Sequence, residues 1–218
     1  DGMELEASNQ IVLISKLTVL FKMLSWGVYF RISGFVCQYL KEIADEIEEL
    51  DSDDAADILG ELSEKRKEEV ISEISDNDLA DDLKELLSYK EDSAGGLMAK
   101  ELVQANENWS VTKCLKEIKK QGENVTRVHS IYVVDDKQKL IGRLSLKDLI
   151  TSPAKNLIKD IYIPKVDSVN VFEDGEEVAK IMSKYDLEAI PVVDNKKQLV
   201  GRITIDDIID FIKEEAEE

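Results

Sequence analysis

Apolar residues recur at helical spacing through the first third of the chain, in four blocks that begin twelve residues apart. The blocks are residues 43–50, 55–62, 67–74 and 79–86, and acidic residues occupy most of the remaining positions. This spacing predicts four short amphipathic helices. The polar stretches between them, such as residues 51–54, supply side chains that cap helix N-termini. Because such short helices cannot bury their apolar faces alone, we expect them to stack as a small solenoid.

A second, longer repeat lies in the C-terminal half. Residues 131–150 and 190–209 align without a gap at an offset of 59, and ten of the twenty positions are identical. Each copy is typical of a strand, a polar hairpin turn, a second strand around Gly142 or Gly201, and a helix. We therefore expect the two copies to be equivalent units of one duplicated module.

A helix is also expected before each copy. Residues 110–118 and 174–182 align at an offset of 64, so the first copy has five extra residues in its helix-to-strand loop. Each unit then has the order helix–strand–strand–helix, and two such units can pair about a pseudo-twofold axis. The predicted fold class is therefore α+β and mostly helical, with a short-helix N-terminal solenoid followed by the two units.

The net charge of −19 is unevenly distributed. Residues 41–92 have a net charge of −15 and residues 203–218 have a net charge of −6, whereas the rest of the chain is nearly neutral. Such a field repels phosphate backbones, so nucleic acid is excluded as an expected partner. Metal cations and basic proteins are favoured instead.

Residues 11–36 form an apolar stretch, but Lys16, Lys22 and Arg31 leave no run of 18 uncharged residues. This argues against a membrane-spanning helix. A buried or partner-facing helix is favoured over a segment at a membrane surface. Residues 1–38 are otherwise unassigned.

Both copies contain the motif Gly-x-x-[Ser/Thr]-x-x-Asp, which runs from Gly142 to Asp148 and from Gly201 to Asp207. This pattern resembles a tandem pair of CBS domains. Residues 91–98, Glu-Asp-Ser-Ala-Gly-Gly-Leu-Met, lie between the acidic helices and the first copy. That arrangement is similar to the junction in magnesium transporters of the MgtE type, and the resemblance covers about four-fifths of the chain, from residue 39 to residue 218.

The resemblance implies the following domains: an acidic helical domain of the MgtE N type at 39–90, a first CBS unit at 91–155 and a second at 156–213. Residues 214–218 would begin a helix leading to a membrane domain that is absent here. In that family the soluble domains lie on the cytoplasmic face of the membrane, sense magnesium and close the pore. The implied partners are the pore domain of the same polypeptide and a second copy, bound through the CBS domains.

Acidic residues at helical spacing are the candidate magnesium ligands. In the last helix Asp207, Asp210, Glu214 and Glu218 fall on one face, and Glu215 is a further candidate. In the helical domain the best candidates are Asp53 and Asp57, near a helix start where acids also complement the helix dipole. For each cluster the alternative interpretation is a solvated helix surface.

By resemblance, the backbone at Gly96 and the side chains of Asp174, Glu176 and Asp186 add further ligands, although Asp174 also fits a helix cap. Magnesium takes one or two carboxylates per ion and keeps several waters. We therefore expect the ions to bridge the acidic faces of the helical and CBS domains, which repel each other without them.

The resemblance also implies a second cofactor, ATP, for the first unit. In nucleotide-binding CBS pairs a carboxylate at the motif position holds the ribose, which identifies Ser145 and Asp148 as candidates. The alternative for these residues is helix capping. The alternative function is an adenine-nucleotide-sensing CBS module whose acidic domain docks a partner protein. The sequence contains no P-loop, GxGxxG or HExxH motif and only one histidine, His129, so we do not expect an enzyme.

Overall fold

The computed structural model describes residues 33–122, 125 and 127–217. The expected apolar segment therefore lies largely outside the described residues. The helical domain contains α2 (Ser33–Ile47), α3 (Ser52–Gly60), α4 (Glu64–Ile71) and α5 (Asn77–Leu86). Helix α2 packs on α4 and α3 packs on α5, with Ile47, Leu59 and Leu83 among the fully buried side chains. The stacked short helices that the twelve-residue period predicts are present.

The first CBS-like unit begins with β1 (Val103–Asn106) and α6 (Val111–Gln121). It continues with β2 (Ile131–Val134), β3 (Leu140–Leu144) and α7 (Leu146–Thr151). After a 3₁₀ turn, η2 (Ile158–Asp160), the short strand β4 (Ile163–Pro164) completes a sheet of order β1-β2-β3-β4.

The second unit repeats this order with β5 (Val169–Asn170), α8 (Gly175–Tyr185), β6 (Ala189–Val193), β7 (Leu199–Thr204) and α9 (Ile205–Glu217). Its sheet has the order β5-β6-β7. The fold class is confirmed, but each unit has an additional strand before its first helix that the sequence pattern did not predict. Strands β1 and β5 precede the first helix of each unit and pair in parallel with β2 and β6. Two to four residues are too few to show a periodic pattern.

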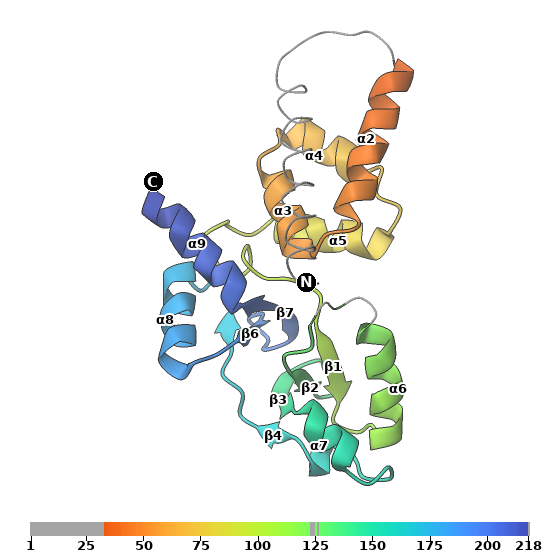
Figure 1. The fold of residues 1–218 in the computed structure, drawn as a ribbon, viewed down its shortest axis with the longest axis vertical. Helices are drawn as coiled ribbons and strands as arrows, with labels where there is room; N and C mark the ends of the chain where they lie inside the picture. Colours follow the sequence, from red (N-terminus) through yellow and green to blue (C-terminus); the bar gives the residue numbers. More distant parts are fainter. Residues whose placement is uncertain (1–32, 123–124, 126, 218) are drawn as a thin grey trace, which may run out of the picture.

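A pseudo-twofold axis relates the units through their hairpin turns. The Leu140 amide donates to the Lys197 carbonyl and the Leu199 amide donates to the Gln138 carbonyl, both at 3.0 Å. These two bonds are equivalent under the offset of 59. The two units therefore contact each other through these turns, as expected for paired units. Their sheets lie next to each other in Figure 1.

Each unit is also extended by the segment that precedes the other one. Arg143 of β3 pairs with Ile163, and the equivalent Arg202 of β7 pairs with Ala99. The equivalent glycines make room for these segments, because a Cβ on Gly142 would lie 2.4 Å from the Ile163 carbonyl oxygen. A Cβ on Gly201 would lie 2.6 Å from Met98 Sδ.

The buried apolar residues form two hydrophobic cores. One, which includes Ile131 and Leu144, belongs to the first unit. The other runs from the helical domain into the second unit, and the fully buried Ala94 and Met98 connect its two parts. Among the residues that the structure describes, no helix is long and apolar enough to cross a membrane.

Candidate functional site

A cavity of about 660 Å³ lies between α3, residues 90–97 and α9. We call it the acidic cleft, because nine carboxylates and a single lysine line it. The lining residues are Asp53, Asp54, Asp57, Glu61, Lys90, Glu91, Asp92, Leu97, Asp207, Asp210, Phe211 and Glu215. The cleft thus brings the acidic helical domain and the acidic last helix together.

Local structure fixes the two innermost carboxylates. Asp53 is the second residue of α3, next to the fully buried Ser52. Asp207 lies in the first turn of α9, where its Oδ2 accepts hydrogen bonds from the Thr204 amide at 2.8 Å and the Thr204 hydroxyl at 2.7 Å. The Thr-x-x-Asp motif therefore caps the start of α9 and holds Asp207 at the edge of the cleft.

Asp53 is electrostatically strained. Burial raises its pKa to about 8, and the negative charge of Asp207 contributes to the same shift. Its Oδ1 is buried and has no hydrogen-bond partner. A buried carboxylate oxygen without a partner is costly unless a proton or a cation compensates it. This position therefore favours binding of a positive charge.

The neighbours of Asp53 experience the same field. The pKa of Asp54 is raised, first by burial and then by Asp207. The pKa of Asp51 is also raised, first by burial and then by Glu101. Each of these carboxylates is thus easier to protonate, or to neutralise with a cation, than a free aspartate.

The donor set suits magnesium only in its hydrated form. Within the described residues, no group of three or more histidine, cysteine or acidic side chains is arranged to hold a metal ion directly. Magnesium, however, keeps several of its waters and uses one or two carboxylates. The unpartnered Asp53 oxygen and the surrounding carboxylates fit an ion that is bound largely through water.

The structure brings five of the eleven predicted ligands to this cleft. Asp53, Asp57, Asp207, Asp210 and Glu215 all line the cleft. The side chain of Glu214 and the whole of Glu218 lie outside the described residues.

The ligands carried over by resemblance divide into two groups. The turn that contains Gly96 lies beside the start of α8, because the Gly175 amide donates to the Asp92 carbonyl at 2.8 Å. Asp174 there caps α8 by accepting from the Glu176 amide at 3.0 Å, and Glu176 is exposed. Asp186 lies at the other end of α8, and none of these four predicted ligands is among the residues that line the cleft.

Three cleft residues were missed by the sequence analysis. Glu61 follows Asp54 and Asp57 at spacings of four and three, so the helical period could have identified it. Glu91 and Asp92 come from the junction between domains, and no period marks them. Only the tertiary fold brings these two residues to the cleft.

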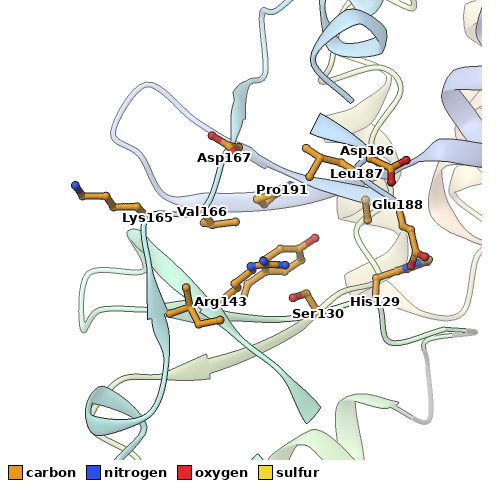
Figure 2. A pocket seen from close by; sticks show the side chains of 13 residues that line it. His129, Ser130, Arg143, Lys165, Val166, Asp167, Asp186, Leu187, Glu188 and Pro191 are labelled. Atoms are coloured by element: carbon orange, nitrogen blue, oxygen red, sulfur yellow. The ribbon is translucent and has the colours of Figure 1, made fainter. Parts of the chain in front are cut away.

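A second pocket, of about 320 Å³, lies between the two units (Figure 2). The first unit contributes Tyr132 and Arg143, the connection contributes Lys165, and the second unit contributes Glu188 and Pro191. Burial raises the pKa of Tyr132 to about 12, so its hydroxyl stays protonated at neutral pH. The pocket combines an aromatic wall and two basic side chains with three carboxylates, those of Asp167, Asp186 and Glu188.

The predicted nucleotide ligands are elsewhere. Ser145 caps α7 by accepting from the Lys147 amide at 3.2 Å. Neither Ser145 nor Asp148 lines the pocket between the units. The observed contact of Ser145 is that of the capping alternative.

Two duplicated units joined about a pseudo-twofold axis, with a stacked-helix domain docked on one of them, define a protein of the tandem-CBS type. Residues 94–155 and 158–214 match the CBS domain family, and residues 40–92 match the MgtE intracellular N domain. The chain belongs to the MgtE family. Its relatives in that family are transporters, which confirms that the chain is not an enzyme.

Solved structures and curated relatives agree with this assignment. The crystal structure of the soluble part of a magnesium transporter is similar with a TM-score of 0.74 and 35% identity, covering 84% of this chain and 73% of that one. The cytosolic domain of the Mg2+ channel MgtE in complex with ATP is similar with a TM-score of 0.72 and 34% identity, covering 83% and 76%.

The magnesium transporter MgtE of Thermus thermophilus is 41% identical over 133 residues, which are 61% of this chain and 30% of that protein. The corresponding MgtE of Enterococcus faecalis is 40% identical over 137 residues, 63% of this chain and 30% of that protein. The matched region therefore spans about 30% of the length of these curated relatives.

Proposed function

We propose that the chain is the magnesium-sensing regulatory region of a magnesium channel or transporter. In this proposal Mg2+ binds in the acidic cleft on the cytoplasmic side and holds the helical domain against the second CBS unit. That closed arrangement would keep the pore shut. The observation that supports the proposal is the buried, unpartnered oxygen of Asp53 close to the charge of Asp207.

The chemistry of the cleft gives a two-state element. Without cations, α3 and α9 bring carboxylates together in a partly buried space, and their repulsion favours separation. A hydrated magnesium ion neutralises charge on both sides at once. Because it binds the closed arrangement better than the open one, it shifts the population toward closure.

Small-angle X-ray scattering of the 218-residue chain during a magnesium titration tests the proposal. We expect the radius of gyration to fall as magnesium rises through the millimolar range, which is typical of weak carboxylate sites. Potassium chloride at matched ionic strength is the control, because general screening also weakens repulsion. Equal compaction by both salts, or compaction by neither, would count against a magnesium sensor.

Asp53→Asn and Asp207→Asn are the matched variants for this titration. Each removes one negative charge and keeps a similar volume, so we expect a smaller magnesium response in both. Asp136→Asn, a substitution at an exposed turn of the first unit, is the control for net charge.

The pocket of Figure 2 supports a second function, binding of an adenine nucleotide. Tyr132 offers an apolar wall, and Arg143 and Lys165 offer positive charge for phosphates. A relative of known structure was solved in complex with ATP. Calorimetry with ATP, with and without magnesium, tests this function, and Arg143→Gln should weaken binding.

The calorimetry and the scattering titration together distinguish the two functions considered for the whole chain. Tight nucleotide binding with no magnesium-dependent change of shape would favour a nucleotide-sensing module whose acidic domain docks a partner protein. A pore domain in the same polypeptide and dimerisation through the CBS domains are further parts of the proposal. The molecular mass measured by light scattering, with and without magnesium, tests dimerisation.

A further inference from the structure

The contact between the helical domain and the CBS pair has a second part, made by side chains outside the lining of the acidic cleft. Residues 99–101 lie along β7 of the second unit, where Ala99 and Arg202 exchange backbone hydrogen bonds of 2.8 and 2.9 Å. From this position Lys100 and Glu101 reach the helical domain. This segment therefore belongs mechanically to the CBS pair although it follows the helical domain directly in the chain.

Lys100 forms the ionic part of this contact. Its Nζ lies 2.7 Å from Glu85 and 3.7 Å from Asp82, both on α5, and its side chain is only 11% exposed. The carboxylates are more open to solvent, with Asp82 43% and Glu85 40% exposed, so the pair is partly buried and is screened by salt less than a fully exposed pair. Lys100 thus offsets part of the negative charge of Asp82 and Glu85, whether or not magnesium is present.

Ser52 adds hydrogen bonds, including two to the carboxylate of Glu101, to the same contact. Its hydroxyl donates to Glu101 Oε2 at 2.8 Å and accepts from the Lys100 amide at 2.8 Å. Ser52 is fully buried and begins α3, the helix that also supplies Asp53 to the acidic cleft. The position of Asp53 is therefore coupled to the contact made by Lys100.

The two parts of the interface differ in the source of their positive charge. In the acidic cleft the lone lysine, Lys90, is 83% exposed and contacts Asp92 at 3.7 Å. At α5 the ammonium group of Lys100 lies between the domains. An ammonium ion and a magnesium ion act in the same direction, because each lowers the repulsion across the interface.

We propose that Lys100 is a resident counter-ion that positions the helical domain on the CBS pair and so sets the magnesium concentration at which the acidic cleft closes. The proposal rests on the proposed function and assigns a residue to its regulation. Lys100 holds part of the interface closed in the absence of magnesium, and the ions need to supply only the remainder.

Lys100→Met tests this role, because it removes the charge and keeps the apolar stem. We expect a larger radius of gyration in EDTA and a magnesium midpoint raised roughly five-fold or more, the range of a typical coupling between sites. Lys100→Arg keeps the charge and should restore both values. Lys84→Met, on the exposed side of α5, changes the net charge equally and should leave both values unchanged.

Circular dichroism and a thermal melt must first show that Lys100→Met is folded. If it is not, Glu85→Gln removes the same ion pair from the other side and should give the same two changes. If Lys100→Met matches Lys84→Met both in EDTA and in magnesium, the proposal is wrong. If the wild type itself does not respond to magnesium, the proposed function fails, and the comparison in EDTA still decides the role of Lys100.

Discussion

The two CBS units share one motif but place it in different surroundings. In the first unit Ser145 caps a short helix, and Asp148 is half-buried in a nearly neutral part of the chain. In the second unit Asp207 instead caps the helix by accepting from the Thr204 amide and hydroxyl, and it also faces the carboxylates of the helical domain. The motif determines the local cap, whereas the neighbouring domain determines whether the carboxylate can serve in cation binding.

The segments that cover the two units explain this difference. Strand β4 covers β3 of the first unit and leads onward into the second unit. Residues 98–99 cover β7 of the second unit and follow the helical domain in the chain. Of the two units, it is therefore the second whose covering segment connects it to the acidic helices.

Substitution of the two equivalent glycines should give the largest effect, because it disturbs the covering segment of each unit separately. Gly142→Ala would push against the Ile163 carbonyl, and Gly201→Ala against Met98. Overpacking of this kind costs about 1–3 kcal/mol, so both should lower the melting temperature by several degrees. Only Gly201→Ala should also weaken the compaction by magnesium in scattering experiments.

Gly122→Ala is the control for these variants, because a Cβ there meets no atom within 4 Å and should change neither property. A Gly201→Ala protein that melts early but compacts like the wild type would separate the covering segment from magnesium sensing. A weakened magnesium response in Gly142→Ala would equally contradict the division between the units.

The pH dependence in EDTA should sharpen the comparison next. The pKa of Asp53 rises to about 8 in the closed arrangement, from an ordinary value of 3.8, so the closed form binds a proton that the open form releases. Closure should therefore weaken as the pH rises from about 5 to about 8, by close to tenfold per unit at most, and level off above that. The radius of gyration measured across this range checks this, and Asp53→Asn should show a weaker pH dependence, because the raised pKa values of Asp51 and Asp54 remain. A radius that stays constant from pH 5.5 to 8.5 would contradict it.

The smallest expected effect is a difference in the magnesium midpoint between Asp207→Asn and Asp148→Asn. Asparagine keeps an oxygen that can accept from Thr204, so the cap of α9 should survive. The magnesium midpoint of Asp207→Asn should rise about five-fold, the lower end of a typical coupling. Asp148→Asn should leave the midpoint unchanged. Equal shifts in both variants would mean that net charge, rather than position, determines the response.

The sequence predicts the elements that depend on local chemistry. The hairpin turns are an example, because Asp135 accepts from the Lys137 amide at 2.7 Å and Asp194 accepts from the Lys196 amide at 2.8 Å. Strands β1 and β5 could not be predicted, since they are short and depend on pairing with distant strands. Local information alone determines the turns but not these sheet edges.

The candidate site shows the same division. Asp53 and Asp207 could be chosen from helical spacing and acidic clustering. Their proximity could not, because it requires the contact between α3 and α9 across the cleft. Lys100 had no signal, since a single lysine in a connecting segment resembles any solvated lysine. The role of Lys100 depends on the two carboxylates of α5 that the fold places beside its ammonium group.

The core shared by the helical domain and the second unit has a consequence for biosynthesis. The helical domain is made first, but the residues that complete its core, from Val169 onward, emerge after the whole first unit. At ordinary rates of synthesis this delay lasts several seconds. The first unit, whose core is its own, can fold during that interval. The nascent helical domain then keeps part of its apolar surface exposed until the second unit arrives to cover it.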